Sequence, residues 1–297
     1  MIKLFRTIYV LPVLLFLTLG LNGCGGGGSG GGSTTPTTSQ GKFIDAAVEG
    51  ITYTSGSTTG TTSADGTFTY ESGKSVTFSI GGITLGTVSG SAIITPVQLV
   101  SGATNQTNAT VTNIVQFLLS IDDDDNASNG IQITPAITAA AASLSIDFTS
   151  STFDLDVSVT NAIVALTGAS STGLRGLVTE SFAQSHLSDS LFSLIAGTYS
   201  GTFSGTDNGT WSVTVTTVSG SSTAVVSGSS TSSFGTFPVS GTINTSGTIS
   251  ASGSGTGSGG TATWTGTVNI TNGTFSGTWN DLTTAVNPDG NFTGTKK

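Results

Sequence analysis

Apolar residues recur at every second position over much of the chain beyond residue 42, and Ser, Thr or Gly fill the positions between them. This period of two is typical of β-strands that bury one face. In the first part of the chain it predicts short strands over residues 43–48, 51–53, 66–70, 75–80 and 83–88. The pair Asp65-Gly66 lies at the start of the third of these segments and predicts a hairpin turn there.

The same alternation returns in residues 197–297, where Gly-Thr, Asn-Gly and Ser-Gly turns separate the apolar groups. The groups are Tyr199/Phe203, Trp211/Val213/Val215, Ala224/Val226, Phe237/Val239/Ile243, Ile249/Ala251, Trp264/Val268/Ile270, Phe275/Trp279 and Phe292. They correspond to about eight antiparallel strands joined by hairpins. Such a meander either closes into a barrel, which has no free sheet edge, or forms a clam of two packed sheets.

Residues 96–196 change to an apolar spacing of three and four, which predicts helices. The expected helices cover residues 110–121, a segment that begins at Thr134-Pro135, residues 157–166 and residues 177–195. Thr134 is a typical N-cap, and Pro135 fits the first helical position. The fold class predicted is mainly β with a helical middle section: a small β-sandwich over 43–95, a helical linker region with an acidic loop over 96–196, and the β meander over 197–297.

Charge limits the classes of partner. Charged residues make up 8% of the chain, and the formal net charge is −9. Two of the seven cations, Lys3 and Arg6, lie in the first segment, so five remain beside sixteen acids, a charge near −11. This excess of negative charge argues against nucleic acid and against an anionic membrane surface as binding partners.

The first 24 residues have the pattern of an export signal. Lys3 and Arg6 precede an apolar run over residues 8–19, which is too short to span a bilayer, and Leu21-Asn22-Gly23-Cys24 follows. This ending resembles the lipobox of bacterial lipoproteins. The resemblance implies that residues 1–23 are removed and that the Cys24 thiol carries a covalent lipid, with palmitate among its acyl groups. The alternative is an ordinary signal peptide that is cut elsewhere and leaves a free thiol.

Cys24 is the only cysteine of the chain, so it cannot form an internal disulfide, and lipidation gives the lone thiol a role. Two or more acyl chains hold a protein stably on a membrane. Residues 24–42 are rich in Gly, Ser and Thr and predict a flexible tether. Gly25 stands where Asp favours inner-membrane retention in lipoproteins of the enterobacterial type, so the resemblance implies the outer membrane of a cell envelope.

Two further resemblances concern the folded part. Val48, Gly50, Tyr53, Gly60, Thr62, Asp65, Gly66, Phe68, Tyr70, Gly73, Val76 and Phe78 form a pattern that resembles β-sandwich modules of the carboxypeptidase-regulatory-like or pilin-B type. The segment VTNIVQFLLSIDDDDNASNGIQI, together with HLSDSLFSLIAGTYSG, is similar to an arrangement in uncharacterised lipoproteins of Gram-negative bacteria. Both resemblances imply a fold and a location, and neither implies an activity.

Four adjacent carboxylates and an amide, Asp122 to Asn126, form the most acidic stretch. Asp122, Asp124 and Asn126 have the alternate spacing of the first ligands of a calcium loop. Ala127 replaces the glycine of such loops, and Ile133 replaces their final Glu. We therefore weigh a calcium site at Asp122, Asp124 and Asn126 against a solvated acidic turn without a cofactor.

Other reactive residues are few. His186 is the only histidine, and Ser185 and His186 on the same expected helix point about 100° apart, which is a poor geometry for a catalytic triad with Asp189. Trp264, Phe275 and Trp279 either fill the C-terminal β domain or line a ligand site there. The leading hypothesis is a non-enzymatic envelope lipoprotein that is held on the membrane by its lipid and acts in binding or adhesion, with an unknown protein or glycan as its ligand, or as a structural surface protein. The alternative is a lipid-anchored carrier with a small apolar ligand inside the barrel.

Overall fold

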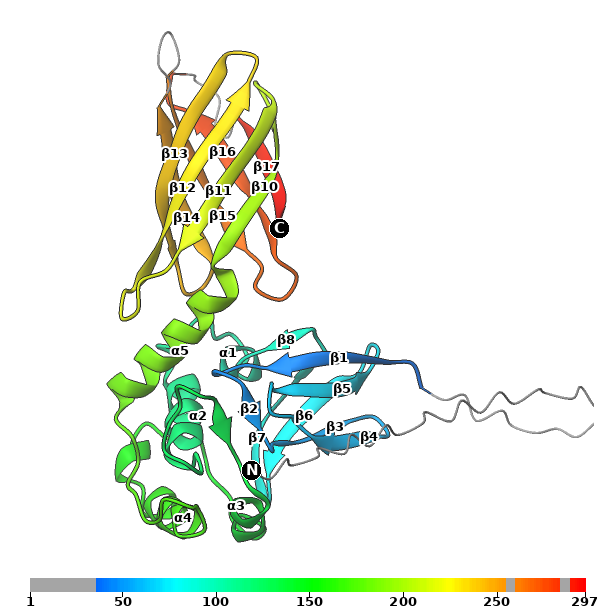
Figure 1. Ribbon diagram of the computed structural model, residues 1–297, viewed down its shortest axis with the longest axis vertical. Helices are drawn as coiled ribbons and strands as arrows, with labels where there is room; N and C mark the ends of the chain where they lie inside the picture. Colours follow the sequence, from blue (N-terminus) through cyan, green and yellow to red (C-terminus); the bar gives the residue numbers. More distant parts are fainter. Residues whose placement is uncertain (1–35, 255–259, 284–288) are drawn as a thin grey trace, which may run out of the picture. The chain divides into compact units, whose positions relative to one another are not determined.

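The computed structural model describes residues 36–254, 260–283 and 289–297. Within them the predicted fold class is confirmed: the chain is mainly β, its helices lie in the middle of the sequence, and its C-terminal strands form a closed antiparallel barrel (Figure 1). The alternative of a two-sheet clam for the C-terminal domain is wrong, because its last strand, Gly290–Lys296, pairs with its first strand, Gly197–Gly205.

The N-terminal strands form two small sheets, as in a β-sandwich. One has the order β5-β1-β8 and the other the order β4-β3-β6-β7. The strands are β1 (Thr38–Phe43), β2 (Val48–Glu49), β3 (Thr52–Ser55), β4 (Thr58–Thr61), β5 (Thr67–Glu71), β6 (Ser75–Ile80), β7 (Ile83–Ser89) and β8 (Ile93–Ile94). Aromatic rings from both sheets meet between them: the centroids of Phe43 and Phe78 lie 4.8 Å apart, and those of Phe68 and Phe78 lie 5.1 Å apart.

Two expectations for this region are corrected. Asp65-Gly66 is a turn, with Gly66 at a φ of 77°, but it does not join a hairpin, because β4 pairs with β3 and β5 pairs with β1. The turn instead carries the chain from one sheet to the other. Strand β1 begins at Thr38, so residues 38–42, which we expected in the tether, belong to the sheet.

The helical region contains α1 (Pro96–Leu99), α2 (Ala109–Ser120), α3 (Pro135–Ala140), the 3-10 helix η1 (Phe153–Leu155), α4 (Val157–Thr167) and α5 (Glu180–Ile195), with the short strand β9 (Ile131–Gln132) between α2 and α3. Four of these were predicted. Helix α5 starts three residues later than expected, because the Thr179 hydroxyl accepts the Phe182 N–H and fixes the helix start. Phe182, in the first turn of this helix, is 52% exposed.

The N-terminal sheets and the helices share one hydrophobic core. Val115 and Leu118 of α2 are buried in the same cluster as Phe43 and Phe78 of the sheets. Strand β9 also pairs with β2 in parallel, so Ile131 lies opposite Val48. The two segments that the sequence separated at residue 96 therefore bury their apolar faces against each other, and we call them together the head, residues 36–196.

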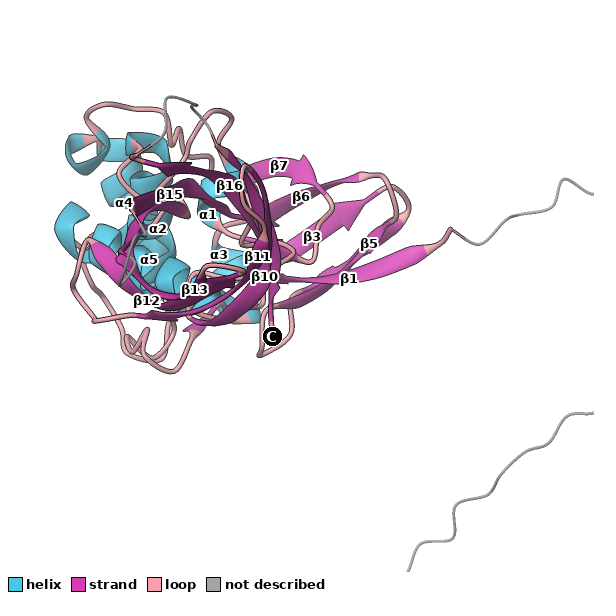
Figure 2. Ribbon diagram, turned by 90° about the horizontal axis from the view of Figure 1, so that it is seen from above, coloured by secondary structure: helices cyan, strands magenta, loops and turns pink. Residues whose placement is uncertain are grey.

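Eight strands form the barrel, each paired with its neighbours in the sequence, and Figure 2 shows their ring from above. They are β10 (Gly197–Gly205), β11 (Gly209–Thr216), β12 (Thr223–Ser232), β13 (Gly235–Asn244), β14 (Thr248–Ser254), β15 (Thr261–Val268), β16 (Thr274–Asp281) and β17 (Gly290–Lys296). Most inward positions are apolar, and most outward positions are Ser or Thr. Glycines make room inside: a Cβ on Gly277 would lie 2.8 Å from the ring of Phe292.

Candidate functional site

A groove of about 330 Å³ lies beside α4. Its floor is aliphatic, and Ile163, Val164, Leu177 and Val178 contribute to it. Asp154 and Glu180 place carboxylates at its edge. Pockets that bind ligands typically have volumes of about 300–1,000 Å³ and combine apolar walls with a few polar groups. This groove lies at the lower end of that range, and we call it the α4 groove.

Helix α4 forms one wall of the groove, because only one face of this helix is buried in the hydrophobic core. Asp156 caps the helix, and its carboxylate accepts the Ser158 N–H at 2.8 Å. Val159, Ile163 and Leu166 are buried on the inner face. Val157 and Val164, on the opposite side, are 70% and 48% exposed. The helix therefore presents aliphatic side chains to solvent as well as to the core.

The opposite wall is the segment 174–179, which has no regular secondary structure and is held in place by hydrogen bonds from neighbouring helices. The Thr167 hydroxyl accepts the Arg175 N–H at 3.1 Å. Both backbone polar groups of Val178 are bonded: its N–H donates to Ser120 Oγ at 2.9 Å, and its carbonyl accepts from the Gln116 side chain at 2.8 Å. Because side chains of α2 and α4 hold this segment, the groove is largely formed before any partner binds.

Arg175 joins the groove to the acidic turn. Its guanidinium donates to the carbonyl oxygens of Ser120 and Asp122, and its Nε lies 3.4 Å from Asp125 Oδ1. Its side chain is only 14% exposed. The positive charge of Arg175 is thus directed at the turn and away from solvent.

The acidic turn bonds mainly to itself. The two carboxylate oxygens of Asp122 accept the N–H groups of Gln132 and Asn126, at 2.8 and 3.0 Å. Asp124 accepts the same Asn126 N–H and the Asn129 side chain, and Asn126 Oδ1 accepts from Ser128. Burial raises the pKa of Asp122, whereas the hydrogen bond from Asn129 lowers the pKa of Asp124.

These contacts bear on the calcium hypothesis. Within the described ranges, no three His, Cys, Asp or Glu side chains gather closely enough to hold a metal ion. The oxygens of Asp122, Asp124 and Asn126 already accept protein hydrogen bonds that a cation would have to displace. The geometry therefore favours the solvated acidic turn. A calcium titration decides between this turn and the calcium site.

We expect the thermal midpoint of the protein to stay constant when calcium is raised to millimolar levels, because the turn is satisfied by its own donors. Calorimetry or circular dichroism, with and without a chelator, measures this. Asp124→Ala is the matched variant. A calcium-dependent rise of the midpoint that disappears in Asp124→Ala would contradict the expectation and would establish the site.

His186 meets a carboxylate that its sequence neighbours did not indicate. Its Nε2 lies 3.6 Å from Oδ1 of Asp45, which is fully buried in the turn between β1 and β2. Neither carboxylate oxygen of Asp45 accepts a hydrogen bond from the described residues. Burial raises the pKa of Asp45 to about 7, and the nearby His186 opposes part of this rise. Asp45 stands within the apolar run Phe43 to Val48, and this isolated charge was the available sequence signal.

The residues considered and rejected for a catalytic triad do not gather around His186 in the described structure. Asp189 faces the loop between β11 and β12, where its carboxylate accepts from Ser219 Oγ at 2.7 Å and from the Gly220 N–H at 3.2 Å. Ser190, one residue further on, accepts the N–H of Ala46 at 2.9 Å. The polar groups of this part of α5 therefore tie the helix to two loops.

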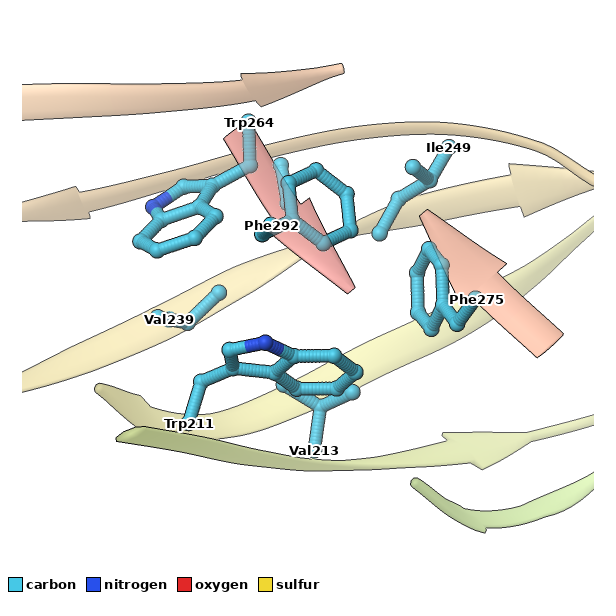
Figure 3. A pocket seen from close by; sticks show the side chains of 8 residues that line it. Trp211, Val213, Val239, Ile249, Trp264, Phe275 and Phe292 are labelled. Atoms are coloured by element: carbon cyan, nitrogen blue, oxygen red, sulfur yellow. The ribbon is translucent and has the colours of Figure 1, made fainter. Parts of the chain in front are cut away.

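Trp264, Phe275 and Trp279, the residues proposed for ligand binding, lie in the core of the barrel. All three are buried. Figure 3 shows the rings of Trp211, Trp264, Phe275 and Phe292 directed toward one another across the interior. The free space among them is about 20 Å³. That volume holds about one water molecule, and a ligand pocket is many times larger.

The indole N–H groups of the barrel provide a matched test of this core. Trp279 Nε1 donates to the Ser204 carbonyl at 3.2 Å, whereas Trp264 Nε1 is buried and has no hydrogen-bond partner among the described residues. Replacing either Trp by Phe removes the same atoms. We expect Trp279→Phe to lower the free energy of unfolding by about 1 kcal/mol more than Trp264→Phe, because only the first loses a hydrogen bond. Urea unfolding of both variants measures the difference, and equal losses would contradict it.

Cys24 and the whole expected signal lie outside the described residues. Among the helices that the structure does describe, none is long and apolar enough to cross a bilayer. No family model matches the chain, and no curated protein matches it. The site is therefore interpreted from its geometry and chemistry alone.

Proposed function

We propose that this protein is a lipid-anchored lipoprotein of a bacterial cell envelope, placed on the outer membrane, that acts by binding another molecule and not by catalysis. Its membrane contact is the covalent lipid on Cys24, and its ligand is a protein or a glycan. Nucleic acid is not a partner, because acids outnumber cations along the chain.

The observation that carries the binding role is the α4 groove. It is preformed, it has an aliphatic floor, and four large exposed aliphatic side chains, at Leu155, Val157, Val164 and Leu174, lie on the segments that form it or adjoin it. Exposed apolar surface of this kind marks interaction sites in soluble domains. The carboxylates at its edge are those of Asp154 and Glu180, which accept from the Gln116 and Gln184 side chains. Among the described residues, neither carboxylate bonds to a nucleophile or a histidine, which supports recognition as the role of the groove.

The alternative, a carrier of a small apolar ligand, needs an open lumen. The cavity inside the barrel has about 20 Å³ of free space, and aromatic and aliphatic side chains pack around it. This observation supports a role of the barrel as a packed structural module. It speaks against Trp264, Phe275 and Trp279 as a ligand site.

The anchor is tested by metabolic labelling of the native cells with a radioactive or clickable fatty acid. We expect label on the wild-type protein and none on Cys24→Ser, because only the thiol of residue 24 can accept the lipid. Protease treatment of whole cells then reports on which side of the membrane the protein faces. Mass spectrometry that finds a bare thiol, or a mature chain that begins elsewhere, would overturn the proposal.

A further inference from the structure

We propose that the α4 groove binds an extended segment of a partner protein that combines aliphatic side chains with Lys or Arg. This inference rests on the proposed binding function and specifies the chemistry of the partner. It depends on three features of the described residues: the aliphatic surface, the distribution of charge around it, and the fixed wall that residues 174–179 form.

The aliphatic surface is concentrated in one part of the head. Leu155 and Leu174 are 81% and 72% exposed, and Val157 is nearly as accessible. All belong to the short stretch that contains η1, α4 and the wall 174–179. Covering such side chains removes apolar area from water, which is the main favourable term in protein association. A partner segment that inserts its own aliphatic side chains along the floor therefore gains most from this site.

The charge around the groove is negative. The lining includes two carboxylates, at Asp154 and Glu180, and one cation, Arg175, and the stretch 145–180 adds two further carboxylates, at Asp147 and Asp156. Arg175 is largely buried and directed at the acidic turn. The carboxylates of Asp154 and Glu180, at the edge of the groove, belong to exposed residues. Cationic side chains of a partner are attracted to such an edge, and anionic ones are repelled.

The same charges argue against two other occupants. In a symmetric pair of copies, the acidic edge of one groove would lie near the acidic edge of the other, and like charges in an interface disfavour association. An anionic lipid surface would be repelled for the same reason. The wall 174–179 is held in place by hydrogen bonds at Arg175 and Val178, so a partner segment can lie against it without first ordering it.

The experiment uses the full chain and two fluorescein-labelled peptides of equal length, one alternating Val with Lys and the other alternating Val with Glu. Fluorescence anisotropy measures their binding. We expect saturable binding of the Lys peptide with a dissociation constant below about 1 mM, the weak limit of peptide recognition, and no binding of the Glu peptide. Raising the salt concentration should weaken the interaction, because exposed charges are screened.

Two surface variants locate the site without disturbing the core. We expect Leu174→Ser to weaken binding of the Lys peptide about tenfold, because its side chain would be buried by the partner. Leu282→Ser is the matched control: Leu282 is 64% exposed but lies beyond β16 in the barrel, and its replacement should leave binding unchanged. The double variant Asp154→Asn and Glu180→Gln should weaken the Lys peptide and remove the discrimination against the Glu peptide.

Several results would overturn the inference: no saturable binding of the Lys peptide, equal binding of both peptides, or an effect of Leu282→Ser equal to that of Leu174→Ser. Analytical ultracentrifugation measures whether the protein forms a dimer. A dimer that Leu174→Ser dissociates would assign the groove to a second copy and not to a basic segment. None of these results depends on Cys24, so the experiments on the groove and those on the lipid anchor test the two proposals separately.

Discussion

Replacing Asp45 by Asn should abolish a large part of the pH dependence of stability between about pH 4 and pH 7. Burial raises the pKa of Asp45 from 3.8 to about 7 in the folded protein. In this pH range the unfolded chain releases the proton and the folded chain retains it, so the free energy of unfolding falls as the pH rises. A difference of about three pH units corresponds to roughly 4 kcal/mol. Asn resembles the neutral carboxyl group and does not titrate.

Chemical unfolding of wild type and Asp45→Asn at several pH values measures this effect. The wild type should lose stability relative to the variant from pH 4 upward, and the difference should level off above about pH 7, the pKa of the buried carboxyl. Asp65→Asn is the control with the opposite sign. Hydrogen bonds from Lys42, Thr67 and Ser63 hold the pKa of Asp65 below its usual value, so its contribution is present at neutral pH and is lost only as the pH falls.

His186→Gln tests the electrostatic part of the same contact. The positive form of His186 opposes the rise of the Asp45 pKa, so its removal should extend the pH-dependent loss of stability to higher pH, while the onset, which the unfolded chain sets, stays near pH 4. A parallel stability profile for wild type and Asp45→Asn at every pH would contradict this account of Asp45. The pair joins the turn after β1 to α5, so these variants also report on how firmly the two elements are held together.

Replacing Phe275 by Ala should lower the free energy of unfolding by about 3–5 kcal/mol, the usual cost of deleting a fully buried aromatic ring. Phe275 is 1% exposed, and its ring lies 5.4 Å, between centroids, from both Tyr199 and Trp211 and 5.5 Å from Phe292. The barrel has little free space into which these neighbours can collapse. The deleted ring therefore leaves a cavity, and lost packing adds to the loss of apolar burial.

Phe234→Ala is the matched control for this measurement. Phe234 is 76% exposed in the turn between β12 and β13, so its truncation should change stability by no more than about 0.5 kcal/mol. Trp fluorescence during denaturant unfolding follows the barrel directly, because all three Trp residues lie in it. A loss below about 1 kcal/mol in Phe275→Ala would indicate an interior that is looser than described. Such an interior would restore the carrier hypothesis.

The barrel shows how an alternating sequence specifies a closed sheet. A period of two places Trp, Phe and Val on one face and Ser and Thr on the other, and turn residues define where each strand ends. Glycines such as Gly266 and Gly277 face each other across β15 and β16, beside the ring of Phe292. All of these features are local, so the number of strands and the choice of the buried face were predictable.

Several features were not predictable because they depend on residues that are distant in the sequence. The pairing of β10 with β17, which separates a barrel from a clam, joins two ends of the domain that no local pattern connects. The place of Asp65-Gly66 between two sheets was missed because a turn residue fixes a turn but not the partner strands. Asp45 and His186 are 141 positions apart, and only the packing of α5 against the β1–β2 turn brings them together.

The sequence by itself determined the classes of secondary structure, the face of each barrel strand that is buried and the excess of negative charge, because each of these depends on composition or on a short repeat. The tertiary structure decided the rest. The barrel is closed and its interior is filled by side chains. The acidic turn bonds to Arg175 and to donors within the turn, and one side of α4 is left uncovered beside the segment 174–179. These outcomes depend on which surfaces the core requires, and only the assembled chain fixes that.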